Sequence, residues 1–185
     1  MMKLVIGGSK CGKSHFAESL FSQFPHRKIY LATMMPFGSE AQIAIDRHRQ
    51  SRLGKGFETM ERFTDLHTLS LPSPCGVLLE CLGNLCANEL FCDAPAPDPV
   101  EKIMAGICHL RSTAMQLVIV SNDVGSDGIA YAKETERYIQ VLGELNCRLA
   151  NLADQVVECV CGIPIYQKDL QTQAWLSGLR QHSRD

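Results

Sequence analysis

The sequence predicts an α/β fold in which helices cover both faces of a mostly parallel central sheet. Short segments that are almost wholly apolar recur along the chain, and segments with apolar residues at helical spacing separate them. Strands that are apolar on both sides belong in parallel sheets buried between two layers of helices. The chain has 185 residues, which suits one compact domain. We expect that domain over residues 1–165, followed by a C-terminal extension over residues 166–185.

The expected strands and helices alternate along the chain. Apolar runs predict strands over residues 4–6, 28–33, 77–82, 117–120 and 156–161, the last of which closes the sheet. Apolar residues three and four positions apart predict a first helix that ends before Pro25, and further helices over 39–52, 101–115 and 138–152. No repeat or low-complexity segment interrupts this pattern.

The composition excludes several classes of partner. The formal net charge is -2 and charged residues make up 21% of the chain, so no excess of either sign favours nucleic acid or an anionic membrane surface. No apolar run approaches the length of about 18 residues that a membrane-spanning helix needs. Nine cysteines are an odd number for a disulfide framework, and no secretory leader precedes the first strand. We therefore expect a cytoplasmic protein without membrane insertion or a nucleic-acid partner.

The stretch GGSKCGKS at residues 7–14 follows the first predicted strand and opens the first predicted helix. It satisfies the pattern GxxxxGK followed by Ser or Thr, which in this setting predicts a P-loop NTPase-like fold and a nucleotide-binding catalytic domain. Glycines let backbone N–H groups turn inward around phosphate oxygens, while the lysine adds a mobile cation and the hydroxyl can bind Mg²⁺. The predicted loop consists of Gly7, Gly8, Ser9, Lys10, Cys11, Gly12, Lys13 and Ser14, with Lys13 catalytic and Ser14 as the metal ligand.

Two further positions carry side chains suited to phosphate chemistry. Glu80 ends an apolar strand, where a carboxylate can lie beside the metal or the nucleotide, although a solvated surface charge is the alternative. His48 stands between Arg47 and Arg49, with Arg52 nearby. Guanidinium groups bind phosphate oxygens in pairs, so this cluster suits a polyanionic substrate. On its own the histidine could equally be structural.

Several stretches resemble, in the same order, the bifunctional adenosylcobinamide kinase/adenosylcobinamide-phosphate guanylyltransferase family of cobalamin biosynthesis. Besides the loop they are YLAT, IDRHRQSR followed by FETMER, LLECLGNLCANELF, IVSNDVG, GELNCRLANLADQVVE and CGIPI, and they extend over residues 3–165. Their joint order and spacing carry the resemblance. The stretch YIQVLGE departs from it, because Ile139, Gln140 and Glu144 stand where relatives commonly carry more charge.

The resemblance implies a two-step activity and the residues that perform it. His48 would take GMP from GTP as a covalent guanylyl-histidine and pass it to adenosylcobinamide-phosphate, itself made from adenosylcobinamide with ATP or GTP and Mg²⁺. A neutral imidazole suits this role because its ordinary pKa is about 6.5. A homotrimer is implied as well. The implied nucleotide contacts beyond the loop are Thr33, Met34, Met35, Arg49, Gln50, Ser51, Arg52, Glu61 and Glu80, and either Glu61 or Glu80 could read guanine.

Two other functions fit the loop without the histidine chemistry. A P-loop small-molecule kinase without guanylyltransfer would use the loop and Lys13, while His48 only bound phosphate or served the fold. A non-catalytic nucleotide-binding regulator would bind GTP without turnover. Transfer of label from α-labelled GTP to the protein separates the bifunctional enzyme from both.

Overall fold

The computed structural model describes residues 1–36, 38, 43, 45, 49–50, 52–125 and 127–170. Within these ranges the chain forms a seven-stranded sheet in the order β3-β2-β4-β5-β1-β6-β7. Neighbouring strands are parallel except for β6 and β7, which pair antiparallel. The strands are β1 (Met2–Ile6), β2 (Arg27–Ala32), β3 (Phe57–Glu61), β4 (Cys75–Glu80), β5 (Gln116–Val120), β6 (Gln155–Val160) and β7 (Ile163–Asp169).

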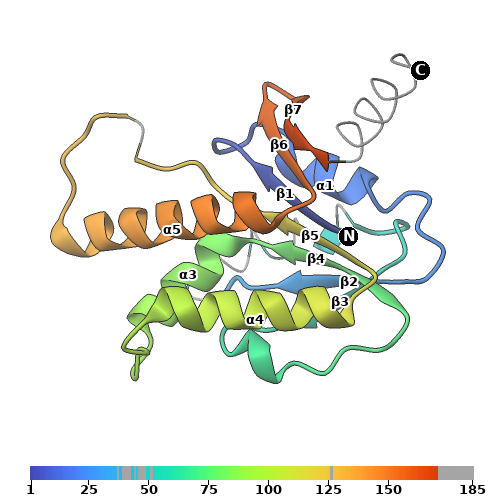
Figure 1. The fold of residues 1–185 in the computed structure, drawn as a ribbon, viewed down its shortest axis with the longest axis horizontal. Coiled ribbons are helices and arrows are strands. Elements are labelled where there is room, and N and C mark those ends of the chain that lie inside the picture. Colours follow the sequence, from blue (N-terminus) through green and yellow to red (C-terminus); the bar gives the residue numbers. More distant parts are fainter. Residues whose placement is uncertain are drawn as a thin grey trace, which may run out of the picture.

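Helices cover both faces of this sheet, as Figure 1 shows. Helices α3, α4 and α5 lie on one face, where Ile107 and Leu145 belong to the larger buried core. Helix α1 lies on the other face, where Phe21 and Leu78 belong to a smaller core. The predicted three-layer α/β fold with a mostly parallel sheet is therefore confirmed. The helices are α1 (Lys13–Ser19), α3 (Leu82–Phe91), α4 (Pro99–Thr113) and α5 (Lys133–Leu152), with a 3-10 helix η1 (Leu66–Thr68).

The structure corrects the sequence expectation at several elements. The apolar run expected as one strand over residues 77–82 is a strand that ends at Glu80 and a helix, α3, that begins at Leu82. Helix α1 ends at Ser19, and turns carry the chain on to Phe24. Strands β3 and β7 were not expected. Because β7 forms the last edge of the sheet, the strand over residues 156–161 does not close it.

The expected domain boundary at residue 165 falls inside β7, so residues 166–169 belong to the sheet and not to an extension. Of the remaining predicted extension, residues 171–185 lie outside the described residues. Most of the helix expected over residues 39–52 lies outside them too.

The carboxyl ends of four neighbouring strands form one row at the edge of the sheet. Ala32 pairs in register with Glu61 on one side and with Glu80 on the other, and Glu80 pairs with Val120. Strand β1 ends beside this row, because Val5 also pairs with Val120. Ligands of open parallel sheets bind outside the carboxyl ends of the strands. The fold therefore points to this edge as the site.

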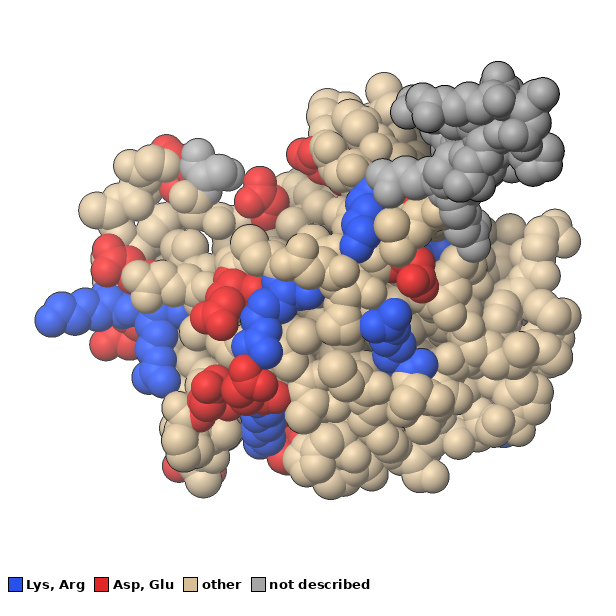
Figure 2. Space-filling model, viewed as in Figure 1, with Lys and Arg blue, Asp and Glu red and all other residues tan. Residues whose placement is uncertain are grey.

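The face that α4 and α5 cover carries charges of both signs. Figure 2 shows Lys and Arg side chains intermixed with Asp and Glu over these helices. One ion pair joins the two helices, with Nη1 of Arg148 2.7 Å from Oε1 of Glu101. Within the described part of the chain, no helix combines the length and the apolar character needed to cross a membrane.

Candidate functional site

The loop after β1 packs so closely that two of its positions require glycine. A Cβ at Gly7 would lie 2.7 Å from Sγ of Cys11 and 2.7 Å from the carbonyl oxygen of Cys159, and one at Gly12 would lie 3.0 Å from Cα of Gly162. Gly12 also has a φ of 93°, a conformation that other residues rarely adopt. The Gly162 N–H donates to the Cys11 carbonyl at 2.9 Å. The turn between β6 and β7 therefore holds the loop in place.

Lys13 is buried at the start of α1, with 8% of the residue exposed. Its ammonium group donates to the Gly8 carbonyl at 2.8 Å, which lays the side chain back across the loop. A lysine held by a neutral carbonyl can exchange this partner for a phosphate oxygen, which binds a cation more strongly.

A cavity of about 400 Å³ opens at the carboxyl edge of the sheet. It extends from the loop after β1 to β2 and β3, and it therefore collects residues that are far apart in sequence. Its polar and charged lining consists of Ser9, Lys10, Lys13, Ser14, Tyr30, Arg49, Arg52, Thr59, Glu61, Glu80, Asn84 and Asn122.

The Ser14 hydroxyl donates to Oε1 of Glu80 inside this cavity. Hydroxyl and carboxylate oxygens are hard ligands that suit Mg²⁺. Among the residues that the structure describes, no three His, Cys, Asp or Glu side chains gather to hold a metal by themselves. The pair fits an ion that completes its coordination with water and substrate phosphates, as Mg²⁺ does in nucleotide sites.

A second carboxylate lies at the β3 end of the cavity. Nη2 of Arg49 donates to Oε1 of Glu61 at 2.7 Å. Thr59 lies two residues earlier on the same face of β3 and lines the cavity as well. Because Ala32 stands between Glu61 and Glu80 in the sheet, the two carboxylates are kept apart by a small side chain.

Thr33 is fully buried, and its hydrogen-bonding groups bind other groups of the protein. Its hydroxyl donates to the Cys81 carbonyl at 2.8 Å, and its N–H donates to the Glu80 carbonyl at 3.2 Å. Its own carbonyl accepts from the Asn88 amide at 2.8 Å, and that amide also donates to the Phe63 carbonyl at 3.0 Å. Thr33 therefore joins β2, β4 and α3.

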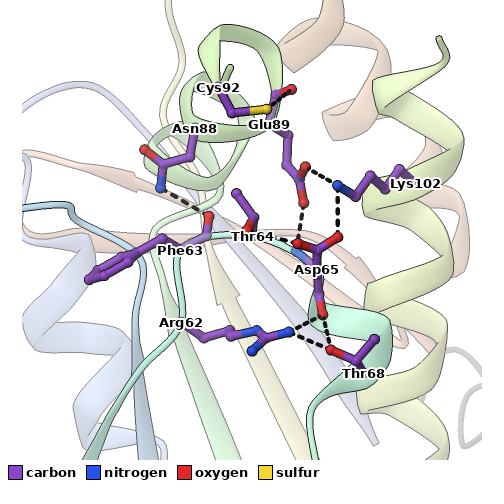
Figure 3. A network of polar contacts seen from close by, with 9 residues as sticks. All are labelled: Arg62, Phe63, Thr64, Asp65, Thr68, Asn88, Glu89, Cys92 and Lys102. Carbon is purple, nitrogen blue, oxygen red and sulfur yellow. Dashed lines mark hydrogen bonds and ion pairs between the residues drawn. The ribbon is translucent and has the colours of Figure 1, made fainter. Parts of the chain in front are cut away.

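Asn88 belongs to a wider polar network between α3, α4 and the chain after β3, which Figure 3 shows. Nζ of Lys102 lies 2.7 Å from Oε2 of Glu89 and 2.8 Å from Oδ1 of Asp65. Oε1 of Glu89 accepts from the Asp65 N–H at 2.8 Å. Only 1% of Glu89 is exposed, so its charge depends on the lysine. The network fixes the chain that leaves Glu61.

The loop after β5 brings Asn122 into the cavity. The Asn146 amide of α5 donates to the Asn122 carbonyl at 3.2 Å, and its oxygen accepts from the Ser121 hydroxyl at 2.6 Å. A Cβ at Gly83 would lie 2.8 Å from the Tyr138 hydroxyl and 3.2 Å from Nδ2 of Asn122. Glycine near the start of α3 therefore leaves room for both side chains.

This arrangement combines a phosphate loop, a hydroxyl–carboxylate pair and two arginines in one cavity, which suits phosphoryl or nucleotidyl transfer. Residues 3–166 match the family described as "Cobinamide kinase / cobinamide phosphate guanyltransferase". The chain belongs to this CobU family. The predicted family, and with it an enzyme of the kinase and guanylyltransferase class, is confirmed.

Individual relatives agree with this assignment over most of their length. The chain is 29% identical over 180 residues to the bifunctional adenosylcobalamin biosynthesis protein CobU of Salmonella typhimurium, a match that covers 89% of this chain and 98% of the relative. It is 30% identical over 181 residues to CobU of Escherichia coli, with the same coverage. It is 28% identical over 167 residues to CobP of Pseudomonas aeruginosa, covering 89% of this chain and 96% of the relative.

In this CobU-family chain the cavity brings together only part of the predicted set. His48 and Ser51 lie outside the described residues. Thr33 is buried, while Met35 and Gln50 are exposed beyond the cavity lining. Gly7, Gly8, Cys11 and Gly12 shape the loop without lining the cavity. The predicted residues that line it are Ser9, Lys10, Lys13, Ser14, Met34, Arg49, Arg52, Glu61 and Glu80.

Four polar residues of the cavity were not predicted from the sequence: Tyr30, Thr59, Asn84 and Asn122. Strand alternation carries a signal for Thr59, which is two residues from Glu61 and therefore shares its face. Asn122 follows a buried strand, where side chains reach the carboxyl edge.

The positions that depart from relatives make contacts of their own. Ile139 packs on the loop after β5, since a Cβ at Gly125 would lie 2.6 Å from Cγ2 of Ile139. Oε1 of Glu144 lies 3.6 Å from Nη1 of Arg148. Ile139, Gln140 and Glu144 do not line the cavity described above.

Proposed function

We propose that this chain phosphorylates adenosylcobinamide with a nucleoside triphosphate, and then transfers GMP from GTP to adenosylcobinamide-phosphate through a guanylyl-histidine at His48. One observation carries the proposal: a single cavity joins the phosphate loop, with Lys13 and Ser14, to Arg49 and Arg52. Arg49 directly follows His48 in sequence. The names of the Salmonella typhimurium and Escherichia coli relatives, bifunctional adenosylcobalamin biosynthesis proteins, support a two-step activity.

In the kinase step, the hydroxyl of the aminopropanol arm of adenosylcobinamide attacks the γ-phosphorus. The bond from that phosphorus to the bridging oxygen breaks, the nucleoside diphosphate leaves and the hydroxyl proton is released. Backbone N–H groups of the loop and the Lys13 ammonium bind the phosphate oxygens and stabilise their charge. Ser14 and Glu80 would hold Mg²⁺, which neutralises phosphate charge when bound.

In the guanylyl step, a neutral His48 nitrogen attacks the α-phosphorus of GTP and pyrophosphate leaves. A phosphate oxygen of adenosylcobinamide-phosphate then attacks the same phosphorus, and the P–N bond breaks to return the imidazole. This route divides one difficult transfer into two easier ones. Arg52 neutralises charge on the transferred group, because its guanidinium lines the same cavity.

The two carboxylates take different roles in this proposal. Glu80 serves the metal, because it accepts from Ser14, the hydroxyl that the loop offers to Mg²⁺. Glu61 reads guanine, whose N1–H and N2 amine are two adjacent donors that a carboxylate can accept together. Guanine selection then serves the second step, and either ATP or GTP can donate the γ-phosphoryl group in the first.

Labelled GTP tests the proposal directly. After incubation with GTP labelled at the α-phosphate, we expect acid-labile, alkali-stable label on the protein, and none on His48→Ala. His26→Ala is the matched control, because His26 is an exposed histidine just before β2, at the amino end of that strand, and does not line the cavity. If the protein phosphorylates adenosylcobinamide but takes up no label, it is a kinase without guanylyltransferase activity. If it binds GTP but performs neither reaction, it is a non-catalytic nucleotide-binding regulator.

The proposal includes a cytoplasmic homotrimer. The exposed apolar side chains of β7, Ile163, Ile165 and Tyr166, support contact with a second copy of the chain. All nine cysteines are free thiols, which suits a reducing compartment. Light scattering coupled to size exclusion measures the oligomeric state, and a monomeric mass at micromolar concentration would contradict the trimer.

A further inference from the structure

Arg52 and Tyr30 form a stacked pair in the wall of the cavity. Cζ of Arg52 lies 3.4 Å from the centroid of the Tyr30 ring, and both residues line the cavity. Tyr30 is 4% exposed and Arg52 is 7% exposed. The Tyr30 ring also contacts Phe57 of β3, and the two rings meet edge to face with their centroids 6.4 Å apart. The guanidinium therefore rests on an aromatic platform that the core holds rigid.

The Arg52 guanidinium retains an unused donor. Its Nη1 is buried and has no hydrogen-bond partner among the residues that the structure describes. A buried cation with an unsatisfied donor is costly unless an anion completes it. Since the group lines the cavity that the phosphate loop also lines, a phosphate oxygen of the ligand is the anion that fits.

Arg49 is arranged differently, although it belongs to the same predicted segment. Its Nη2 donates to Glu61 at 2.7 Å, and its side chain is 49% exposed. An arginine that already neutralises a carboxylate attracts phosphate less strongly. Arg52, and not Arg49, is therefore the guanidinium that the cavity holds for phosphate.

Tyr30 suits the role of a platform and not that of an acid or base. Burial raises the pKa of its phenol, so the side chain stays neutral at every working pH. A neutral aromatic face attracts a cation through its quadrupole, and the attraction is strongest where water is excluded. Stacking engages the face of the guanidinium plane, so the N–H donors, which lie at its edge, take no part in the stacking.

We propose that Tyr30 is a positioning residue that holds Arg52 in place to bind a phosphate of the nucleoside triphosphate. The inference rests on the proposed function for the identity of the nucleotide. The inference adds a role for Tyr30 that the proposed function does not include: with Arg52, Tyr30 contributes to binding of the phosphates and not to recognition of the base.

A double-mutant cycle on GTP binding tests the inference. We expect Tyr30→Leu and Arg52→Ala each to raise the Kd for GTP roughly 5- to 30-fold, and the double variant to be little weaker than Arg52→Ala alone. Guanosine, which has no phosphate, should bind all variants within about twofold of the parent protein. Tyr30→Phe, the conservative variant, should recover most of the GTP affinity because it keeps the ring.

Additive losses, or equal losses for guanosine and GTP, would overturn the inference. Melting temperatures identify variants that fail to fold. Arg52→Lys is the second variant, since it keeps the charge but lacks the planar fork that stacks. It should weaken GTP binding about fivefold or more with Tyr30 intact, and GTP binding unchanged by this substitution would also overturn the inference. The two proposals can fail separately. If the effects of the Tyr30 and Arg52 substitutions on GTP binding are coupled but labelled GTP leaves no label on His48, this inference holds and the guanylyl-transfer proposal is wrong.

Discussion

Nη2 of Arg49 lies 2.7 Å from Oε1 of Glu61, and both residues line the cavity. The two side chains are about half exposed, at 49% and 47%. Exposed ion pairs of this kind contribute at most about 1 kcal/mol to stability. The pair therefore matters chiefly for the cavity, where the arginine holds one carboxylate oxygen of Glu61 in place.

Glu61→Gln should weaken guanine selection without unfolding the protein. The amide cannot accept from both guanine donors, and its own N–H₂ opposes them. We expect the preference for GTP over ITP, which lacks the N2 amine, to fall roughly 10-fold or more, measured as a ratio of Kd values. Glu58→Gln is the matched control, because Glu58 lies on the other face of β3 and pairs with Arg27 at 2.6 Å. An unchanged ratio in Glu61→Gln would move base recognition to another residue.

Ser14→Ala and Glu80→Gln should both raise the Mg²⁺ concentration needed for half-maximal kinase activity. Each change removes one oxygen group of the pair proposed to hold the ion. We expect an increase of about tenfold or more, from titration of activity against Mg²⁺ at saturating nucleotide. Ser19→Ala is the control, since its hydroxyl donates to the Phe16 carbonyl at 2.7 Å and Ser19 does not line the cavity. Equal Mg²⁺ dependence in Glu80→Gln and the parent protein would remove Glu80 from the metal site.

Lys102→Met should destabilise the fold by about 3 kcal/mol, because it leaves the buried Glu89 carboxylate without its cation. Urea denaturation measures the loss. The double variant with Glu89→Gln should recover part of it, since the remaining amide is neutral. Lys133→Met, at the exposed start of α5, is the control and should change stability by less than about 0.5 kcal/mol. A small effect of Lys102→Met would show that water reaches Glu89.

The buried strands of the fold could be predicted because strands buried on both faces consist mainly of apolar residues. Strands β1, β4 and β5 are almost wholly apolar, and the loop after β1 carries its phosphate-binding residues in consecutive positions. Strand β3, with the sequence FETME, has no such apolar run, because it lies at the edge of the sheet and its residues are partly or fully exposed. Strand β7 is exposed along most of its length and contains Pro164, so its strand character depends on pairing with β6.

The junction between β4 and α3 shows why the cavity could be predicted only in part. The chain passes from strand to helix at Cys81 with no glycine or proline at the junction, so no turn signal in the sequence marks this boundary. The stacking of Arg52 on Tyr30 joins the turn before β3 to β2, and these two segments are distant in sequence. Sequence spacing carries no information about such contacts.

Asp65→Asn should make the protein less stable at neutral pH and equally stable in acid. Hydrogen bonds from Lys102 and Thr64 lower the pKa of the Asp65 carboxyl below its usual range. A carboxyl whose pKa is lower in the folded than in the unfolded protein stabilises the fold at pH values above its pKa in the unfolded chain, which is about 3.9. This stabilisation is lost as the pH falls through the pKa of the carboxyl in the folded protein. Because the side chain is 43% exposed, we expect less than about 1 kcal/mol at pH 7.

Urea unfolding of Asp65→Asn and the parent protein between pH 7 and pH 2 measures this difference, with Asp93→Asn in the turn after α3 as an exposed control. The substitution keeps the backbone of residue 65, because asparagine tolerates its positive φ of 56°. A difference that grew as the pH fell would contradict the lowered pKa.

Alanine at two helical glycines should change stability in opposite directions. A Cβ at Gly106 in α4 would lie 2.6 Å from Cβ of Leu66 and 3.3 Å from the backbone nitrogen of His67, so α4 and η1 must separate. We expect Gly106→Ala to destabilise the protein by about 1–3 kcal/mol. Gly143 in α5 has no atom within 4 Å of such a Cβ, so Gly143→Ala should stabilise by about 0.5–1 kcal/mol through helix propensity. Urea denaturation measures both, and a Gly106→Ala protein as stable as the parent would contradict the tight packing of α4 on η1.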